Sequence, residues 1–236
     1  MFKQYTKKIL ASLLTLNVIF SFNALGANKD LSQDIMISAD RQGADLKSKT
    51  SIYFDNVVIS QGSLTIYADL VKISANENTV KTYLLKGEPA KLKQTLQDGS
   101  EIFLEAKVIS YQPENSLITI QGDAKLQQLK NKIVADEIIY HITTEQLNAK
   151  GSPAVLEQKV NDSNNITLEA QNVIYQPALS LISIKGKAKL KQEGSEVHAN
   201  QIIYNIATEK MEALGSKDQA VKTILQPQLK NDTNNE

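Results

Sequence analysis

The sequence predicts an all-β protein, an array of bent antiparallel strands built from internal repeats. One observation is a phrase, GEPAKLKQ, that returns along the chain at regular spacing. The other is an alternation of apolar and polar residues that stops repeatedly at an alanine. Alternation with period two puts every second side chain on one face, as in a β-strand, and helical periodicity is absent after the first residues of the chain.

The first 26 residues are expected to be a removable export signal peptide. A lysine-rich start is followed by an apolar run over residues 9–22 and by a small-residue cleavage pattern that ends at Gly26. The alternative is an uncleaved membrane anchor, which needs roughly 20 apolar residues, and this run is shorter. We therefore predict cleavage after Gly26, which leaves an exported protein.

The composition limits the possible partners and metal sites. The chain has 26 basic and 26 acidic residues, and the expected signal holds three of the lysines and no acid, so the exported part carries a charge near −3. This balance gives no argument for a nucleic-acid partner. The absence of cysteine excludes disulfides and thiolate metal sites. The remaining length fits one large or two small domains, but the repeats favour one continuous array.

The repeated phrase occurs in four versions. They read GEPAKLKQ from Gly87, GDAKLQQ from Gly122, GSPAVLEQ from Gly151 and GKAKLKQ from Gly186. The glycines stand 35, 29 and 35 residues apart, and only the first and third versions contain a proline. The repeating unit is therefore a pair of phrases that spans 64 residues.

Each apolar alternation is predicted to form a strand with a corner at its alanine. Apolar residues stand two residues before each alanine and, from the second copy on, three and five residues after it. The change from even to odd spacing would turn the wrong face to the core unless the strand bends or bulges there, and a small side chain suits such a crowded corner. The corner alanines are Ala39, Ala68, Ala106, Ala135, Ala170 and Ala199.

Turn-forming sequences separate these predicted half-strands. ENSL, TTEQ, NDSNN and QEGS lie between the apolar segments, in which Val, Ile, Thr and Tyr dominate as strands prefer. The first repeat unit, SIYFDNVVISQGSLTIYADLVKIS, is predicted to point Ile52, Phe54, Val58, Leu64 and Ile66 inward.

The chain resembles the LptA family of periplasmic lipopolysaccharide transport bridge proteins, which carry an OstA-like repeated β domain. The resemblance rests on ISADRQGADL, DNVVISQGSLTIYAD, the GEPAKLKQ phrase and the ending VKTILQPQLKNDTNNE, and it covers nearly all of the exported chain. Members of the family usually carry fewer repeats. The 64-residue pair that begins near Gly122 therefore resembles an additional copy and is expected to lengthen the array.

The resemblance implies a semi-open β-jellyroll over residues 27–226, followed by a flexible tail over residues 227–236. Its apolar interior would take the acyl chains of lipopolysaccharide, the lipid A part, while the sugars stay outside. The N-terminal edge would accept a component of the inner-membrane transport complex, and the C-terminal edge would meet a component of the outer-membrane translocon. Copies would associate head to tail in the periplasm, and an ATP-driven extractor in the inner membrane would push cargo through the conduit. The chain itself would need no cofactor.

The predicted groove residues share an inward place in the alternation or in the repeated phrase. They are Ile35, Ile37, Ile52, Phe54, Val58, Leu64, Ile66, Val71, Ile73, Leu92, Ile102, Leu104, Ile109, Tyr111, Ile118, Ile120, Leu126, Ile133, Ile138, Tyr140, Leu168, Val173 and Tyr175. The predicted partner edges are Ile35 and Ile37 at one end and Val221, Thr223 and Leu225 at the other.

Two features have an ordinary alternative. The inward stripe would look the same in a packed β-sandwich, although five Phe and no Trp leave aliphatic walls suited to hydrocarbon chains. The segment IMISA has neither charge nor proline, as expected of an edge strand that joins a partner's sheet, but it could also pair within its own domain.

A row of lysines marks one face near the C-terminus. Lys185, Lys187, Lys189 and Lys191 alternate, so they share a face opposite Leu190. Such a face could meet the phosphates of an anionic glycolipid, but a solvated strand surface is the more frequent explanation, so these lysines are left out of the predicted site.

Catalysis and metal binding find little support in the sequence. His141 and His198 stand in different contexts, and Asp40, Asp69 and Asp136 follow corner alanines where other copies carry Lys, Gln or Asn. A polar cap at a bend explains such a mixed set, whereas an acid–base pair or a metal site needs carboxylates. We therefore predict that the protein is not an enzyme and has no catalytic or metal-ligating residues.

Two other classes of exported β protein were weighed. A parallel β-helix polysaccharide lyase also shows repeats, but its rungs are usually nearer 20 to 30 residues, and its acids and bases cluster in one region. An outer-membrane barrel should carry aromatic girdles, and 6% aromatic residues with a polar NDTNNE ending argue against it.

Overall fold

The computed structural model describes residues 33–75, 81–96, 98–159 and 165–226. The predicted signal (1–26) and tail (227–236) lie outside these residues. Apart from a short 3-10 turn, η1 (Pro177–Leu179), the regular elements of the described part are strands. They are β1 (Met36–Ser38), β2 (Arg41–Asp45), β3 (Thr50–Gln61), β4 (Leu64–Ala75), β5 (Lys81–Thr95), β6 (Glu101–Gln112), β7 (Leu117–Gln128), β8 (Asn131–His141), β9 (Gln146–Lys159), β10 (Asn165–Gln176), β11 (Leu181–Gln192), β12 (Ser195–Asn205), β13 (Lys210–Leu214) and β14 (Lys222–Ile224).

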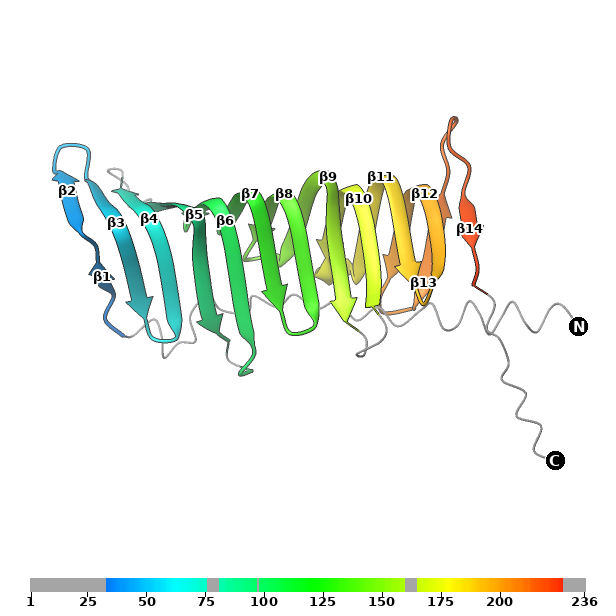
Figure 1. Cartoon of the computed structure of the whole chain (residues 1–236), viewed down its shortest axis with the longest axis horizontal. Helices are drawn as coiled ribbons and strands as arrows, with labels where there is room; N and C mark the ends of the chain where they lie inside the picture. Colours follow the sequence, from blue (N-terminus) through cyan, green and yellow to red (C-terminus); the bar gives the residue numbers. More distant parts are fainter. Residues whose placement is uncertain (1–32, 76–80, 97, 160–164, 227–236) are drawn as a thin grey trace, which may run out of the picture.

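The strands form one antiparallel sheet in which sequence neighbours are also neighbours in space. The order runs from β1 through β3 and each following strand to β13. β2 continues β1 along β3, and β14 continues the line of β13 along β12. Figure 1 shows the resulting long array, with the first strands at one end and the last at the other. The predicted all-β array of antiparallel strands is confirmed.

Each long strand bends near its middle, as the change of spacing predicted. The strand pairings shift register at this point in every pair from β3–β4 to β11–β12. Alanines of adjacent strands lie opposite each other beside the shifts: Ala90 and Ala106, Ala124 and Ala135, Ala154 and Ala170, Ala188 and Ala199. The alanines therefore line a corner that divides the sheet into two arms.

The two forms of the repeated phrase make two forms of the corner. In the short form, Gly122 has φ +78°, a left-handed conformation that glycine adopts without strain. In the long form, a Cβ atom on Gly87 would lie 2.6 Å from the backbone nitrogen of Ala90, so the backbone closes too tightly for a side chain. The prolines of the long form, Pro89 and Pro153, both follow cis peptide bonds.

The arms fold against each other around one apolar core. We name the glutamine arm for the strand halves that end in Gln94, Gln128, Gln158 and Gln192, and the tyrosine arm for the halves that end near Tyr83, Tyr111, Tyr140, Tyr175 and Tyr204. One cluster of buried residues takes members from both arms, and no residue of that cluster is more than 9% exposed. The sheet is thus a jellyroll closed along its corner, with its inner faces in contact.

The predicted inward set of the first repeat is wrong on β3. Ile52, Phe54 and Val58 are only half buried and stand outside the core cluster, and the guanidinium carbon of Arg41 lies 5.2 Å from the centre of the Phe54 ring on the outer face. The residues that face the core are their neighbours Tyr53, Val57 and Ile59. Leu64 and Ile66 on β4 do point inward.

The error on β3 has a physical cause in the local sequence. The segments IYF and VVI are apolar on both faces, so alternation leaves the phase of the strand undetermined. The bend also contains two left-handed residues, Asp55 with φ 62° and Asn56 with φ 49°, instead of a single slipped residue. Tyr53 and Val57 therefore keep an even spacing across this bend, as core-facing residues do at the short-form corners of β7 and β11, whereas the spacing is odd on β4, β6, β8, β10 and β12.

Candidate functional site

The interior of the folded sheet is the candidate site, and it runs the length of the array. The glutamine arm contributes one inner row of cross-strand neighbours: Ile59, Ile66, Leu92, Leu104, Leu126, Ile133, Leu156, Leu168, Leu190 and Val197. The tyrosine arm contributes another: Val71, Leu85, Ile109, Ile120, Ile138, Ala149, Val173, Ile184 and Ile202. Both rows are buried and, in the described residues, contain only aliphatic side chains.

The structure places most of the predicted groove residues in this interior. The buried ones are Ile66, Val71, Leu92, Ile102, Leu104, Ile109, Ile118, Ile120, Leu126, Ile133, Ile138, Tyr140, Leu168, Val173 and Tyr175. Ile37, Leu64, Ile73 and Tyr111 are half buried and pack against the cluster. Ile35 is 57% exposed, because it precedes β1 at the open end of the array.

Sequence reasoning missed interior residues in the second repeat pair. Ile182, Ile184, Leu190, Ile202 and Tyr204 are buried, yet the predicted set stops at Tyr175. Each stands 64 residues after a predicted position, and copying the first pair onto the second would have found all five. The same shift finds Leu156 and Ile166.

A row of tyrosines borders the interior where the tyrosine arm ends. Tyr83, Tyr111, Tyr140, Tyr175 and Tyr204 stand on every second strand or on adjacent ones, joined across the sheet by apolar partners such as Ile118 and Leu147. The rings of Tyr83 and Tyr111 stack with centroids 5.9 Å apart. Burial raises the pKa of Tyr111 and of Tyr175. These hydroxyls therefore stay neutral where the arm meets the interior.

A row of buried amides borders the interior where the glutamine arm ends. Gln94, Gln128, Gln158 and Gln192 alternate there with Ile102, Asn131, Ile166 and Ser195. The amide Nε2 of Gln158 donates a hydrogen bond to Oδ1 of Asn131 at 3.2 Å. Sequence reasoning missed this row, although each glutamine is the last residue of a repeated phrase.

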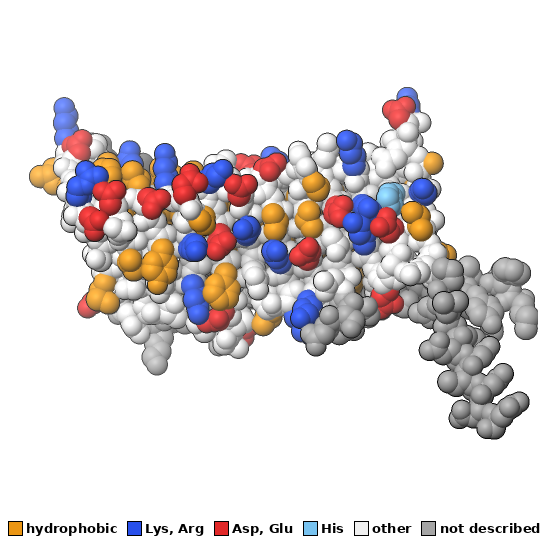
Figure 2. Space-filling view, in the orientation of Figure 1, with side chains coloured by type: hydrophobic (Ala, Val, Ile, Leu, Met, Phe, Trp, Pro, Cys, Tyr) orange, Lys and Arg blue, Asp and Glu red, His pale blue; other side chains and the backbone are white. Residues whose placement is uncertain are grey.

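Charged residues cover the outer face and largely pair with each other. Figure 2 shows lysines and acidic residues interspersed over the array. Lys191 Nζ lies 2.9 Å from Glu169, and Lys189 Nζ lies 3.3 Å from Glu196. The hydrogen bond from His198, at 2.7 Å, is the main cause that lowers the pKa of Glu196. Two of the four predicted surface lysines are thus engaged with carboxylates.

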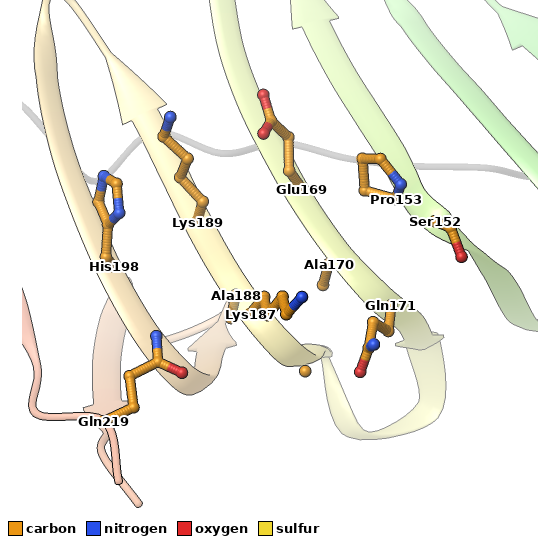
Figure 3. A pocket seen from close by; sticks show the side chains of 11 residues that line it. Ser152, Pro153, Glu169, Ala170, Gln171, Lys187, Ala188, Lys189, His198 and Gln219 are labelled. Carbon is orange, nitrogen blue, oxygen red and sulfur yellow. The ribbon is translucent and has the colours of Figure 1, made fainter.

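The two main hollows of the described part lie at the corner and mix apolar with polar side chains. Figure 3 shows one of them over β9 to β12, with Glu169, Lys189 and His198 on adjacent strands and Gln171 and Gln219 at its border. Three of its charged members, Glu169, Lys189 and His198, already pair with neighbouring side chains. This hollow offers no continuous apolar wall for a hydrocarbon chain.

The residues weighed for catalysis lie apart. His141 is exposed at the end of β8, His198 contacts Glu196 on β12, and Asp40 accepts a hydrogen bond from Asn56 Nδ2 at 2.8 Å. Within the described ranges, no three His, Cys, Asp or Glu side chains gather in a way that could hold a metal ion. Nor does any helix in those ranges have the length and hydropathy to cross a membrane.

The fold and the interior define an all-β repeat protein whose single sheet folds around a continuous aliphatic core and ends in strands that are paired on one side only. The family model described as LptA/(LptD N-terminal domain) LPS transport protein matches residues 36–146 and again residues 143–210. The chain belongs to this family.

Curated relatives carry the corresponding names. The lipopolysaccharide export system protein LptA of Haemophilus influenzae is 33% identical over 156 residues, which make up 64% of this chain and 88% of that protein. The protein of the same name from Escherichia coli strain K12 is 25% identical over 173 residues, 67% of this chain and 94% of that protein. The crystal structure of LptH, described as the LptA homologous periplasmic component of the lipopolysaccharide transport device of Pseudomonas aeruginosa, aligns with 16% identity and a TM-score of 0.31 over 84% of this chain and 99% of that chain.

The alignments also bear on the length of the array. The matched stretch is a larger share of each curated relative than of this chain, so this chain is the longer one. The family model matches twice in succession. Both findings agree with the expectation of an additional repeat pair.

Proposed function

We propose that this protein is a periplasmic lipopolysaccharide transport protein that holds lipid A acyl chains in its interior and passes them along the array. The observation that carries this proposal is the unbroken aliphatic lining from β3 to β12 in a member of this family. The relatives from H. influenzae and E. coli are named lipopolysaccharide export system proteins. The chain needs no cofactor and performs no reaction in this role.

The lining would supply affinity through hydrocarbon burial. Removing a methylene from water is worth about 0.8 kcal/mol, so several long acyl chains offer ample driving force. The interior is filled by the protein's own side chains, and entry therefore requires the arms to part along the side opposite the corner. Contacts between the arms are then exchanged for contacts with cargo, which keeps the net cost of opening small and permits release at the far end.

The two ends of the sheet support a role in a chain of linked domains. Ile35 lies exposed beside β1, and Val221 and Leu225 lie exposed beside β14. An unpaired strand edge recruits another sheet through main-chain hydrogen bonds. We assign the β1 edge to the inner-membrane transport component, the β14 edge to the outer-membrane translocon component, and the contact of one edge with the other to head-to-tail self-association.

The proposal also includes export by a cleaved signal and the bounds of the transport domain. Cleavage after Gly26 would deliver residues 27–236 to the periplasm, where residues 27–226 form the transport domain. The rival class of polysaccharide-active enzymes needs a cluster of acids and bases, and in the described residues the candidate side chains lie apart.

A plain structural module is the second candidate, favoured by one observation. The inner rows are almost fully buried, and Leu126, Ile133 and Leu156 show no exposed surface. A packed core of this kind needs no cargo, so the experiment must separate a filled interior from one that opens.

Photo-crosslinking in cells tests the two candidates. A photoreactive residue is placed at Leu104, which points into the interior, or at Glu105, which faces outward between Lys91 and Lys125. Adducts are detected with an antibody to lipopolysaccharide. An adduct at 104 and none at 105 supports transport through the interior. If variants that fold and reach the periplasm give no adduct at either position, the inner aliphatic rows are an ordinary packed core.

A further inference from the structure

The repeated phrase keeps four residue types in all of its copies, and one of them is polar although it is buried. The glycine and alanine form the corner, and the leucine of each copy (Leu92, Leu126, Leu156 and Leu190) lies in the inner row. The last residue is always glutamine, although the residues around it vary. It occupies a buried position where an aliphatic side chain would pack as well.

The glutamines form an evenly spaced row inside the sheet. Gln94, Gln128, Gln158 and Gln192 are 1%, 1%, 7% and 6% exposed, and they stand on β5, β7, β9 and β11. Strands lie about 4.8 Å apart, so successive glutamines are about 10 Å apart along the array. They lie two residues beyond the inner leucines on the same face, at the free end of the arm. That is where the interior opens if the arms part.

One member of the row, Gln94, carries hydrogen-bonding capacity that the closed interior does not use. The side-chain carbonyl Oε1 of Gln94 is buried and accepts no hydrogen bond from any described residue. A buried carbonyl without a donor lowers stability, and an apolar side chain of the same shape would avoid that loss. The amide is therefore better explained by a ligand that reaches it than by packing.

We propose that the glutamine row binds the carbonyl and hydroxyl groups at the heads of the acyl chains of the cargo, and so selects acylated saccharides over simple amphiphiles. This inference rests on the proposed function. With acyl chains in the inner rows, their ester and amide carbonyls and hydroxyls lie at the free ends of the arms. A glutamine amide suits both groups, because Nε2 donates to a carbonyl while Oε1 accepts from a hydroxyl.

The spacing adds a consequence for movement. Each glutamine would present the same donor and acceptor to the cargo, one step of about 10 Å after another. A molecule that leaves Gln94 finds an equivalent site at Gln128, and the next at Gln158. Equivalent sites make successive positions similar in free energy, which favours passage over trapping.

Paired variants test the inference in the full exported chain. Gln94→Met with Gln128→Met removes two amides and nearly keeps side-chain volume. Leu92→Met with Leu126→Met, on the same strands and the same face, is the matched control. Equilibrium binding is measured with purified lipid A and with dihexadecyl phosphate, which has long chains and a phosphate but no carbonyl or hydroxyl at the chain heads. Circular dichroism checks that each variant folds.

The glutamine pair is expected to weaken lipid A binding about tenfold and to leave dihexadecyl phosphate binding unchanged. The leucine pair is expected to leave the ratio of the two affinities unchanged. Equal weakening for both probes, or unchanged lipid A binding in the glutamine pair, overturns the inference while the proposed function stands. A wild-type chain that binds neither probe overturns both.

A gain of selectivity offers a second test that does not depend on the first pair folding. Ile102 lies between Gln94 and Gln128 in the same row, on β6. Ile102→Gln adds an amide there and is expected to raise the preference for lipid A over dihexadecyl phosphate. An unchanged preference in the folded variant contradicts the proposed role of the row.

Discussion

The middle of the array and its two ends use the same kind of strand in different ways. In the middle, each strand runs unbroken through the corner and pairs on both sides, and its inward side chains are fully buried. At each end the last strand is split at the corner, into β1 and β2 or into β13 and β14. Apolar side chains remain exposed there, including Ile35 and Leu225.

The difference shows that a terminal repeat leaves one strand edge unpaired, because no further repeat pairs with it. Each repeat buries its apolar face by pairing with the next, as in other repeat arrays, and the terminal repeats have no neighbour on one side. Most proteins blunt such edges with charge or proline, and the MIS segment of β1 has neither. Under the proposed function, the ends would provide specificity for other sheets and the middle would hold the cargo.

A charged substitution is expected to give the largest difference in stability between the middle of the array and its ends. Leu104→Arg places a charge among side chains that no water reaches, and it is expected to lower the free energy of unfolding by at least about 3 kcal/mol. Ile35→Arg, the same kind of change at the exposed end, should stay within about 0.5 kcal/mol. Urea unfolding followed by circular dichroism measures both. Similar losses at both sites would mean that the ends are packed as tightly as the middle.

Substitutions at the corner are expected to give a smaller difference in stability, again with the larger loss in the middle of the array. Ala135 is buried opposite Ala124, and Ala135→Leu should cost about 1–3 kcal/mol because the corner has no room for a larger side chain. Ala39, between β1 and β2, is half buried, and Ala39→Leu should cost less than about 1 kcal/mol. Urea midpoints give the comparison, and a harmless leucine at position 135 would contradict the crowded corner.

The ends should control association without controlling the fold. Ile37→Pro removes a main-chain donor from β1 and is expected to weaken self-association at least about tenfold, because a strand edge binds through such donors. Light scattering at rising protein concentration measures the effect, and Thr223→Pro on β14 should reproduce it from the opposite edge. A proline variant that unfolds instead would show that β1 belongs to the core.

The sequence was enough to predict the architecture because several repeats carry the same pattern of apolar residues. Period-two alternation fixes strands, and the odd spacing beyond each alanine fixes a bend. Where one copy is ambiguous, the others settle the phase. The first repeat unit lacks that support: it is apolar on both faces around Asp55 and Asn56, and the inward assignment of Ile52, Phe54 and Val58 failed there.

The candidate site was predictable only in part, since some of its features arise from pairing across the sheet. The aliphatic rows follow from alternation. The tyrosine and glutamine rows appear only when the strands are in register, because Gln94 and Gln128 are far apart in the chain and lie in one row through Ile102. The splitting of the end strands is likewise a result of pairing, with no signal in the local sequence.

Tyrosine ionisation gives the smallest expected difference. Burial raises the pKa of Tyr175 above its ordinary value of 10.0, with a further contribution from Glu145. The folded state thus holds this proton more tightly than the unfolded chain, and the associated stability is complete below pH 10 and is lost as the pH rises through the folded pKa. Tyr175→Phe removes this titration, so the fall in stability above pH 10 should become slightly shallower.

Tyr67→Phe, on the outer face near the N-terminal end, is the control, since an exposed phenol loses little hydration on folding. Urea unfolding at a series of alkaline pH values measures both variants. An equal change in the pH dependence of the free energy of unfolding would mean that Tyr175 is as hydrated as Tyr67.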